Sequence, residues 1–124
     1  MIICWWKVKN MEIDKEMLKG YIDTILMSLI KDSSMYGYEL AKKVREISED
    51  TFELKEGTLY LSLKRLEKNG YVKSYWDDSE SGGGRRKYYA ITEEGLEYIQ
   101  KKNQQWIFMR DLIDKFMGGS KNER

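Results

Sequence analysis

Apolar residues recur every three or four positions along the first half of the chain, which is the spacing of an amphipathic helix. The pattern over residues 14–30 predicts a first helix with Asp14 as its N-cap. A shorter pattern over residues 36–47 predicts a second helix. The apolar residues that this second helix is expected to bury are Leu40, Ala41, Val44 and Ile47.

The third helical pattern begins at Lys55 or Glu56 and ends at Asn69. Asn69-Gly70 is a good stop signal because both residues tolerate a left-handed backbone. The buried stripe of this helix is expected to comprise Leu59, Leu63 and Leu66. Its solvent-facing side is expected to carry Thr58, Tyr60, Ser62, Lys64, Arg65 and Lys68.

The pattern then changes from helical to extended. Residues 71–76 and 87–92 are rich in aromatic and β-branched side chains, which favour strands. The segment between them contains Gly82-Gly83-Gly84 and ends in Arg85-Arg86. Together these features predict a two-stranded hairpin with a long mobile tip.

A last helix is predicted from Glu93 to Met117, between an N-cap at Thr92 and a stop at Gly118-Gly119. Its heptad seam, which has two polar interruptions, comprises Leu96, Ile99, Asn103, Trp106, Arg110, Ile113 and Met117. The residues that widen this apolar face are Phe108, Met109, Leu112 and Phe116. A small domain cannot cover so wide a face, so we expect the helix to pair with its symmetry mate. The alternative is a helix folded back on its own domain.

Three helices, a hairpin and a long helix follow the order of a winged helix-turn-helix with a dimerisation helix appended. The predicted fold is mainly α with a small β hairpin, in the α+β class. We expect a winged helix-turn-helix DNA-binding domain at residues 14–92 and a C-terminal dimerisation helix at 93–117. Residues 1–13 are expected to form an N-terminal arm, and residues 118–124 a disordered tail.

The first ten residues allow two interpretations. They are apolar around Trp5 and Trp6, but they lack the charged region and the cleavage site of a signal peptide. Met11 offers a second start, so the segment before it is either an upstream extension of the reading frame or a native arm. A native arm would pack its two tryptophans on a partner subunit.

Composition narrows the chemistry. The chain has 124 residues, enough for one domain, with 41% hydrophobic and 35% charged residues. It contains one cysteine, Cys4, and no histidine, which excludes an intrachain disulfide, a zinc site built on His and Cys, and nucleophile–histidine catalysis. No window is apolar enough to span a bilayer. We therefore expect a cytoplasmic protein that is not an enzyme and has no cofactor, no metal and no membrane partner.

The net charge is only +1, so any affinity for DNA must come from positive charge concentrated on one face. The solvent-facing side of the third helix suits the major groove, because its hydroxyls and cations can contact phosphates and base edges. Taken alone, the same pattern equally describes the solvated side of an amphipathic helix.

The predicted wing favours the DNA interpretation. Gly82-Gly83-Gly84 gives an adaptable backbone, and Arg85-Arg86-Lys87 supplies three charges suited to phosphates. A nucleotide-binding P-loop is not indicated, since no Gly-Lys-Ser/Thr ending is present. The alternative function is a winged-helix protein-interaction module without specific DNA binding, which predicts little salt-dependent affinity for DNA.

Trp106 occupies a seam position where coiled coils prefer Leu or Ile. It either fills a gap in the core or, beside its symmetry mate, lines a flat aromatic slot at the dimer centre. Such a slot would bind planar hydrophobic ligands by stacking.

Four motifs carry a family resemblance: Met-Tyr-Gly-Tyr-Glu-Leu at 35–40, Glu-Gly-Thr-Leu-Tyr at 56–60, Leu-Lys-Arg-Leu-Glu-Lys-Asn-Gly at 63–70, and Gly-Gly-Arg-Arg-Lys-Tyr-Tyr-Ala-Ile-Thr-Glu-Glu-Gly at 83–95. In this order and spacing, the chain resembles the PadR family of transcriptional regulators over roughly residues 16–116. Its single terminal helix is similar to that of the short, LmrR-like subfamily.

The resemblance implies a homodimeric repressor that binds a palindromic operator in double-stranded DNA and is released by a small molecule or another signal. The positions that match the DNA-contacting surface of the family are Tyr38, Lys42, Thr58, Tyr60, Lys64, Gly84, Arg85 and Arg86, to which the charge pattern adds Arg65. The residues of the last helix expected to form the dimer interface are Leu96, Ile99, Asn103, Trp106, Met109, Ile113 and Phe116.

The resemblance also implies a ligand slot for a small planar, hydrophobic or aromatic molecule, such as a drug or a phenolic compound. Trp106 matches the subfamily's slot tryptophan, and the residues that match the opposite wall are Met17, Thr24, Met27 and Ser28. The sequence departs from the subfamily one turn beyond the tryptophan, where Arg110 replaces an acidic residue. A neutral or anionic ligand therefore fits the sequence as well as a cationic one.

Overall fold

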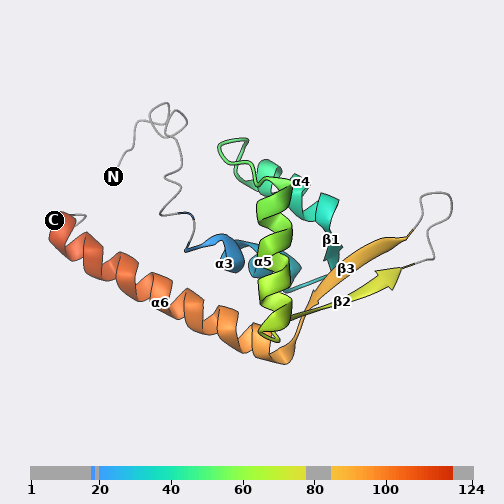
Figure 1. Ribbon diagram of the computed structural model, residues 1–124. Helices are drawn as coiled ribbons and strands as arrows, with labels where there is room; N and C mark the ends of the chain where they lie inside the picture. Colours follow the sequence, from blue (N-terminus) through green and yellow to red (C-terminus); the bar gives the residue numbers. More distant parts are fainter. Residues whose placement is uncertain (1–17, 19, 78–84, 119–124) are drawn as a thin grey trace.

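The computed structural model describes residues 18, 20–77 and 85–118. Its helices and strands follow one another along the chain (Figure 1) as α3 (Ile22–Ile30), β1 (Met35–Tyr36), α4 (Gly37–Ile47), α5 (Glu56–Lys68), β2 (Val72–Asp77), β3 (Arg86–Ile91) and α6 (Glu93–Met117). This is the predicted mainly α arrangement with a small sheet, in the α+β class. Asp14, the glycine-rich tip up to Gly84 and the tail from Gly119 lie outside the described residues.

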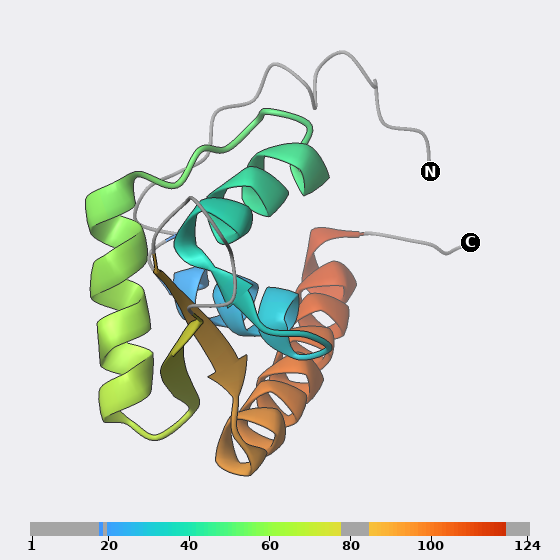
Figure 2. The same cartoon turned by 90° about the vertical axis from the view of Figure 1, so that its right-hand side faces the viewer.

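The short helix α3 lies at the centre of the domain, with α4, α5 and α6 around it (Figure 2). It contributes Leu26, Met27 and Ile30 to the core, each at most 1% exposed. The predicted stripe of α5, Leu59, Leu63 and Leu66, is buried against it. Helical periodicity thus correctly identified the stripe by which α5 packs against α3.

The sheet has three antiparallel strands in the order β1-β3-β2, and not only the two of the predicted hairpin. The two residues of β1 pair with β3, Met35 opposite Tyr89. The β2–β3 register places Val72 opposite Ile91 and Trp76 opposite Lys87. A two-residue strand has no periodicity of its own, so the sequence pattern could not reveal β1.

Three further predictions are corrected by the structure. The predicted helix over residues 14–30 is interrupted, because Gly20 and Tyr21 form a turn and α3 begins at Ile22. Ile47 is 68% exposed, since α4 ends there and the chain turns away, while Leu54 from the following loop joins the core. Ser62 is 2% exposed because it lies between Leu59 and Leu66 on the buried side of α5.

Both predicted ends of α6 are confirmed. The Thr92 hydroxyl accepts a hydrogen bond from the Gly95 backbone N–H at 3.0 Å. At the other end Gly118 is the C-cap, with φ of 75°, a left-handed conformation that favours glycine. The second half of α6 extends well beyond the rest of the domain (Figure 1).

Candidate nucleic-acid interface

The helix-turn-helix pair α4 and α5 is held by a close approach at Gly37. A Cβ added at Gly37 would overlap the Tyr60 hydroxyl, so the phenol of α5 lies directly on the first residue of α4. The turn before α4 is fixed locally, because the Tyr36 backbone N–H donates to Glu39 Oε1 at 3.2 Å. These contacts fix the orientation of α5 relative to α4.

The predicted contact residues on these two helices are solvent-exposed. Tyr38 is 63% exposed and Tyr60 42%, and Thr58 and Lys64 are exposed as well. Lys42 is exposed and lies 4.0 Å from Glu46, one helical turn away. These side chains of α4 and α5 can therefore reach a ligand outside the domain.

Arg65 forms an ion pair within the domain that was not predicted, and its side chain stays 52% exposed. Its guanidinium donates to both carboxylate oxygens of Asp23 on α3, at 2.7 and 3.1 Å, and to the Ser62 hydroxyl at 3.2 Å. The hydrogen bond with Asp23 raises the pKa of Arg65 further above its ordinary value, against a smaller opposite effect of burial. Arg65 thus joins α5 to α3, and its position on the exposed side alone did not indicate this bond.

Cations of the wing lie against aromatic rings. The guanidinium of Arg85 lies 4.8 Å from the ring centroid of Trp76 on β2, and that of Arg86 lies 4.8 Å from Tyr36 on β1. Lys87 Nζ lies 5.7 Å from the Trp76 ring. These cation–π contacts fix the direction of the charged groups beside the helix-turn-helix pair.

Four tyrosines form a row across the sheet from α4 to β2. Tyr36 and Tyr38 stack at 6.4 Å, Tyr36 meets Tyr88 edge-on at 5.4 Å, and Tyr88 stacks on Tyr75 at 5.8 Å. This row was not predicted from the sequence, although the density of tyrosine in the strands was its visible signal. The row thus connects β2 and β3 with the start of α4, and Arg86 lies against one of its rings, that of Tyr36.

The sheet and α6 are tied to the end of α5. Ser74 of β2 donates to Glu67 at 2.6 Å, and the Thr92 hydroxyl donates to the Gly70 carbonyl at 2.6 Å. Burial raises the pKa of the Tyr89 phenol, and the charges of Tyr60 and Glu67 act in the same direction. Direct hydrogen bonds therefore join the third helix to β2 and to the start of α6.

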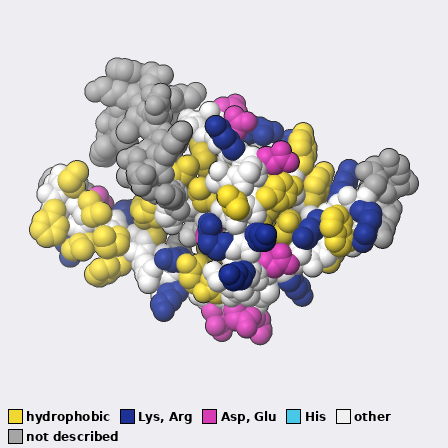
Figure 3. Space-filling view, in the orientation of Figure 1, with side chains coloured by type: hydrophobic (Ala, Val, Ile, Leu, Met, Phe, Trp, Pro, Cys, Tyr) yellow, Lys and Arg dark blue, Asp and Glu magenta, His cyan; other side chains and the backbone are white. Residues whose placement is uncertain are grey.

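Figure 3 shows where charge and apolar surface gather on one face of the molecule. Lys and Arg side chains lie over the region of α5 and beside the wing, and hydrophobic side chains gather toward the far end of α6 (Figure 3). The interface is thus defined by the exposed residues of α4 and α5 and by the wing cations, at one end of a molecule whose other end is apolar.

The exposed apolar face of α6 includes most of the predicted seam. Its large hydrophobic members, each at least 36% exposed, are Leu96, Trp106, Ile107, Phe108, Met109, Leu112, Ile113, Phe116 and Met117. Asn103 is exposed too. Ile99 is an exception at 7% exposed, because it packs into the core of its own domain, and its prediction as an interface residue is corrected.

Trp106 is half-exposed at 49% and makes an edge-on contact with Tyr21, at 6.2 Å between ring centroids. On α3, Ser28 is exposed and Thr24 partly exposed, but Met27 is fully buried in the core and is therefore removed from the predicted slot wall. Met17 and Gly84, the remaining predicted site residues, lie outside the described residues.

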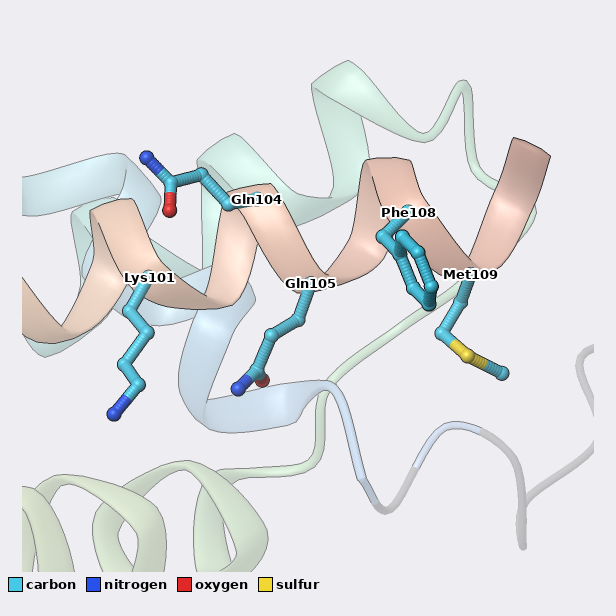
Figure 4. A pocket seen from close by; sticks show the side chains of 5 residues that line it. All are labelled: Lys101, Gln104, Gln105, Phe108 and Met109. Atoms are coloured by element: carbon cyan, nitrogen blue, oxygen red, sulfur yellow. The ribbon is translucent and has the colours of Figure 1, made fainter. Parts of the chain in front are cut away.

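An open hollow lies along α6 (Figure 4). It is lined by Lys101, Gln104, Gln105, Phe108 and Met109. All five side chains come from the one helix, so this wall is incomplete unless a second surface faces it.

The described part of the chain contains neither a metal-binding cluster nor a membrane-spanning helix. There, no group of three or more Cys, Asp or Glu side chains is placed to hold a metal ion. None of the described helices combines the length and the apolar character that crossing a membrane requires.

A family model described as the transcriptional regulator PadR-like family matches residues 25–101. The chain is similar in structure to a transcriptional regulator from Clostridium thermocellum, with a TM-score of 0.75 and 42% identity over 84% of this chain and 97% of that one. It is also similar to a PadR family transcription regulator from Clostridium difficile, with a TM-score of 0.71 and 45% identity over 80% of this chain and 100% of that one. An uncharacterized protein of Lysinibacillus sphaericus is 36% identical over 86% of this chain and 97% of its own length.

Proposed function

Because the chain belongs to the PadR-like family of transcriptional regulators and is not an enzyme, we propose that it is a dimeric, sequence-specific DNA-binding repressor. In this proposal a palindromic operator in double-stranded DNA binds two copies of the helix-turn-helix pair and the wing. A small hydrophobic or aromatic ligand at the dimer interface releases the repressor from its operator. The role places the protein in the cytoplasm, beside the DNA.

One observation carries the DNA-binding part of the proposal: α5 exposes Thr58, Tyr60 and Lys64 in the same domain that holds Arg85 and Arg86 against aromatic rings. A helix with exposed polar side chains suits the major groove, and cations fixed beside it suit the adjacent phosphates. A net charge of +1 is sufficient because the cations are concentrated where the backbone of DNA would pass.

The apolar face of α6 supports the dimer. A contiguous apolar surface on a helix that extends beyond its own domain marks an interaction site. A second copy supplies the same apolar surface by two-fold symmetry, and it also presents a second α5 to the other half of a palindrome.

The exposure of Trp106 supports a ligand slot at that interface. The indole is half-exposed and lies edge-on to Tyr21, Ser28 of α3 is exposed and Thr24 partly exposed, and a partner's α6 would provide the facing wall. Arg110 is paired with Asp111 at 3.3 Å, which offsets its charge. The ligand that fits best is planar and neutral, because this ion pair carries no net charge.

The experiment that tests the proposal is a salt series of binding to duplex DNA from the protein's own promoter and to a scrambled duplex. A repressor binds the promoter selectively, and its affinity falls steeply as salt rises because bound phosphates release counterions. If the own promoter is not preferred, selection from random duplexes supplies the operator. Weak, unselective binding in both assays would refute the proposal and favour the protein-interaction module.

A further inference from the structure

The exposed face of α5 has an apolar side chain near its centre. Leu61 is 66% exposed, and its neighbours on this face, Lys64 and Lys68, are exposed as well. At about 100° per residue, Leu61 projects about 160° away from both Leu59 and Leu63 of the buried stripe. Its side chain therefore points away from the domain, among lysines.

The two flanks of α5 are held by the rest of the domain. Arg65 on one flank binds Asp23 of α3, and Glu67 on the other flank accepts a hydrogen bond from Ser74 of β2. Arg65 and Glu67 project about 160° apart. The face between them, which carries Leu61, is the part of the helix that remains for an external ligand.

We propose that Leu61 recognises the 5-methyl group of a thymine in each half of the operator, an inference that rests on the proposed DNA-binding function. Of the four bases of DNA, thymine is the one that displays a methyl group in the major groove. Proteins recognise this methyl group by apolar contact. A leucine side chain has no donor or acceptor with which to bind a phosphate or a polar base edge. Lys64 and Lys68 beside it suit phosphates, which position the helix but carry no sequence information. Leu61 is therefore a specificity-determining residue.

Gly57, one turn before Leu61 on the same face, makes a close approach possible. A Cβ added at Gly57 would have open space around it, with no atom within 4 Å. The backbone of α5 is thus uncovered at the end that enters the groove first, and the base pairs can come within reach of Leu61.

The inference is tested on the full chain with an operator obtained as above, in which each thymine is replaced in turn by deoxyuridine. This replacement removes the methyl group and leaves every hydrogen-bonding atom in place. We expect one symmetric pair of positions at which wild-type affinity falls about fourfold for each methyl removed, and about fifteenfold for both. Leu61→Ala should bind the unmodified operator about as weakly as wild type binds the doubly modified one, and should be insensitive to the replacement.

Two variants control this test. Leu61→Met keeps an apolar side chain of similar reach and should keep the sensitivity, whereas Lys64→Ala should weaken all the duplexes alike and also keep it. Specific binding without a sensitive thymine, or sensitivity that persists in Leu61→Ala, would overturn the inference and leave the proposed function intact. Failure to select any preferred duplex would overturn both.

Discussion

At the scale of single residues, the wing arginines are positioned by aromatic rings on two different strands. Arg85 lies on Trp76 and Arg86 on Tyr36. A guanidinium held over a ring loses less freedom when it binds a phosphate than one on a mobile side chain does. The aromatic residues of the sheet thus orient the wing arginines for the proposed contact with the DNA backbone.

Replacing Arg85 and Arg86 together by Ala should weaken binding to operator and scrambled DNA alike. The salt dependence should also flatten, because the slope of log affinity against log salt falls by about 0.9 for each phosphate that the protein no longer neutralises. Fluorescence anisotropy of labelled duplexes over a salt series measures both effects.

The matched control is the double variant Lys101→Ala with Lys115→Ala, which removes the same charge from exposed positions of α6 outside its seam. It should leave the salt slope unchanged. A loss confined to the operator in the wing variant would show that the arginines read bases rather than phosphates.

Two glycines in the first turns of helices make a second comparison at this scale. A Cβ at Gly95 would overlap the carbonyl oxygen of Tyr71, whereas a Cβ at Gly57 would meet no atom within 4 Å. Gly95→Ala should therefore lower the free energy of unfolding by about 1–3 kcal/mol, as overpacking does. Gly57→Ala should leave it unchanged or raise it slightly. Urea unfolding at one protein concentration tests the pair, and equal values for both would contradict the close approach at Gly95.

At the scale of elements, Thr92 connects the sheet with α6. Its hydroxyl caps α6 by accepting from Gly95, and it donates to the carbonyl of Gly70 after α5. The same residue therefore fixes where α6 begins and how α6 is oriented relative to the end of α5.

Thr92→Ala should destabilise the protein by about 1–2 kcal/mol, the usual cost of losing an N-cap. Thr92→Ser keeps the hydroxyl and should lower the free energy of unfolding much less. Urea unfolding followed by circular dichroism distinguishes the two variants. If Ser were as destabilising as Ala, the methyl group of Thr92, and not its hydrogen bonds, would be the stabilising part.

At the scale of the whole molecule, the apolar face of α6 predicts the oligomeric state. Ile113 and Phe116 are 48% and 83% exposed on the single chain. Replacing both by Asp would bury carboxylates in the proposed interface, at several kcal/mol for each ion. Light scattering coupled to gel filtration should then show monomers, and operator affinity should fall because the two halves of the palindrome are no longer linked.

Ile47→Asp is the control, because Ile47 is 68% exposed at the end of α4 and lies outside this face. The Ile47→Asp variant should remain dimeric. A wild-type protein that is monomeric at micromolar concentration would contradict the dimer itself.

The proposed ligand slot also belongs to the scale of the whole molecule, because it lies at the proposed dimer interface. Trp106→Ala should leave the dimer intact and abolish the quenching of tryptophan fluorescence by a planar aromatic ligand. Trp5, Trp6 and Trp76 give a background signal, so Trp76→Phe serves as a comparison and should still be quenched. Dissociation of Trp106→Ala into monomers would mean that the indole is interface core rather than a ligand wall.

Much of the architecture was accessible from the sequence, because it depends on residues a few positions apart. Helical periodicity found α4, α5 and the buried stripe Leu59, Leu63 and Leu66. The cap residues Thr92 and Gly118 fixed both ends of α6, since capping is a local hydrogen-bonding property. The exposed polar positions of α5 were likewise identified, with Ser62 as the exception.

The tertiary structure alone decided which residues at the edges of these patterns are buried and what polar groups meet across elements. Ile47 and Met27 carry equally apolar side chains, yet one is exposed and the other is in the core, because only the latter has neighbouring elements around it. The Arg65–Asp23 bond and the row of tyrosines join residues far apart in the chain. Such contacts depend on how helices and strands are placed relative to one another, which no local pattern of hydrophobic and polar residues contains.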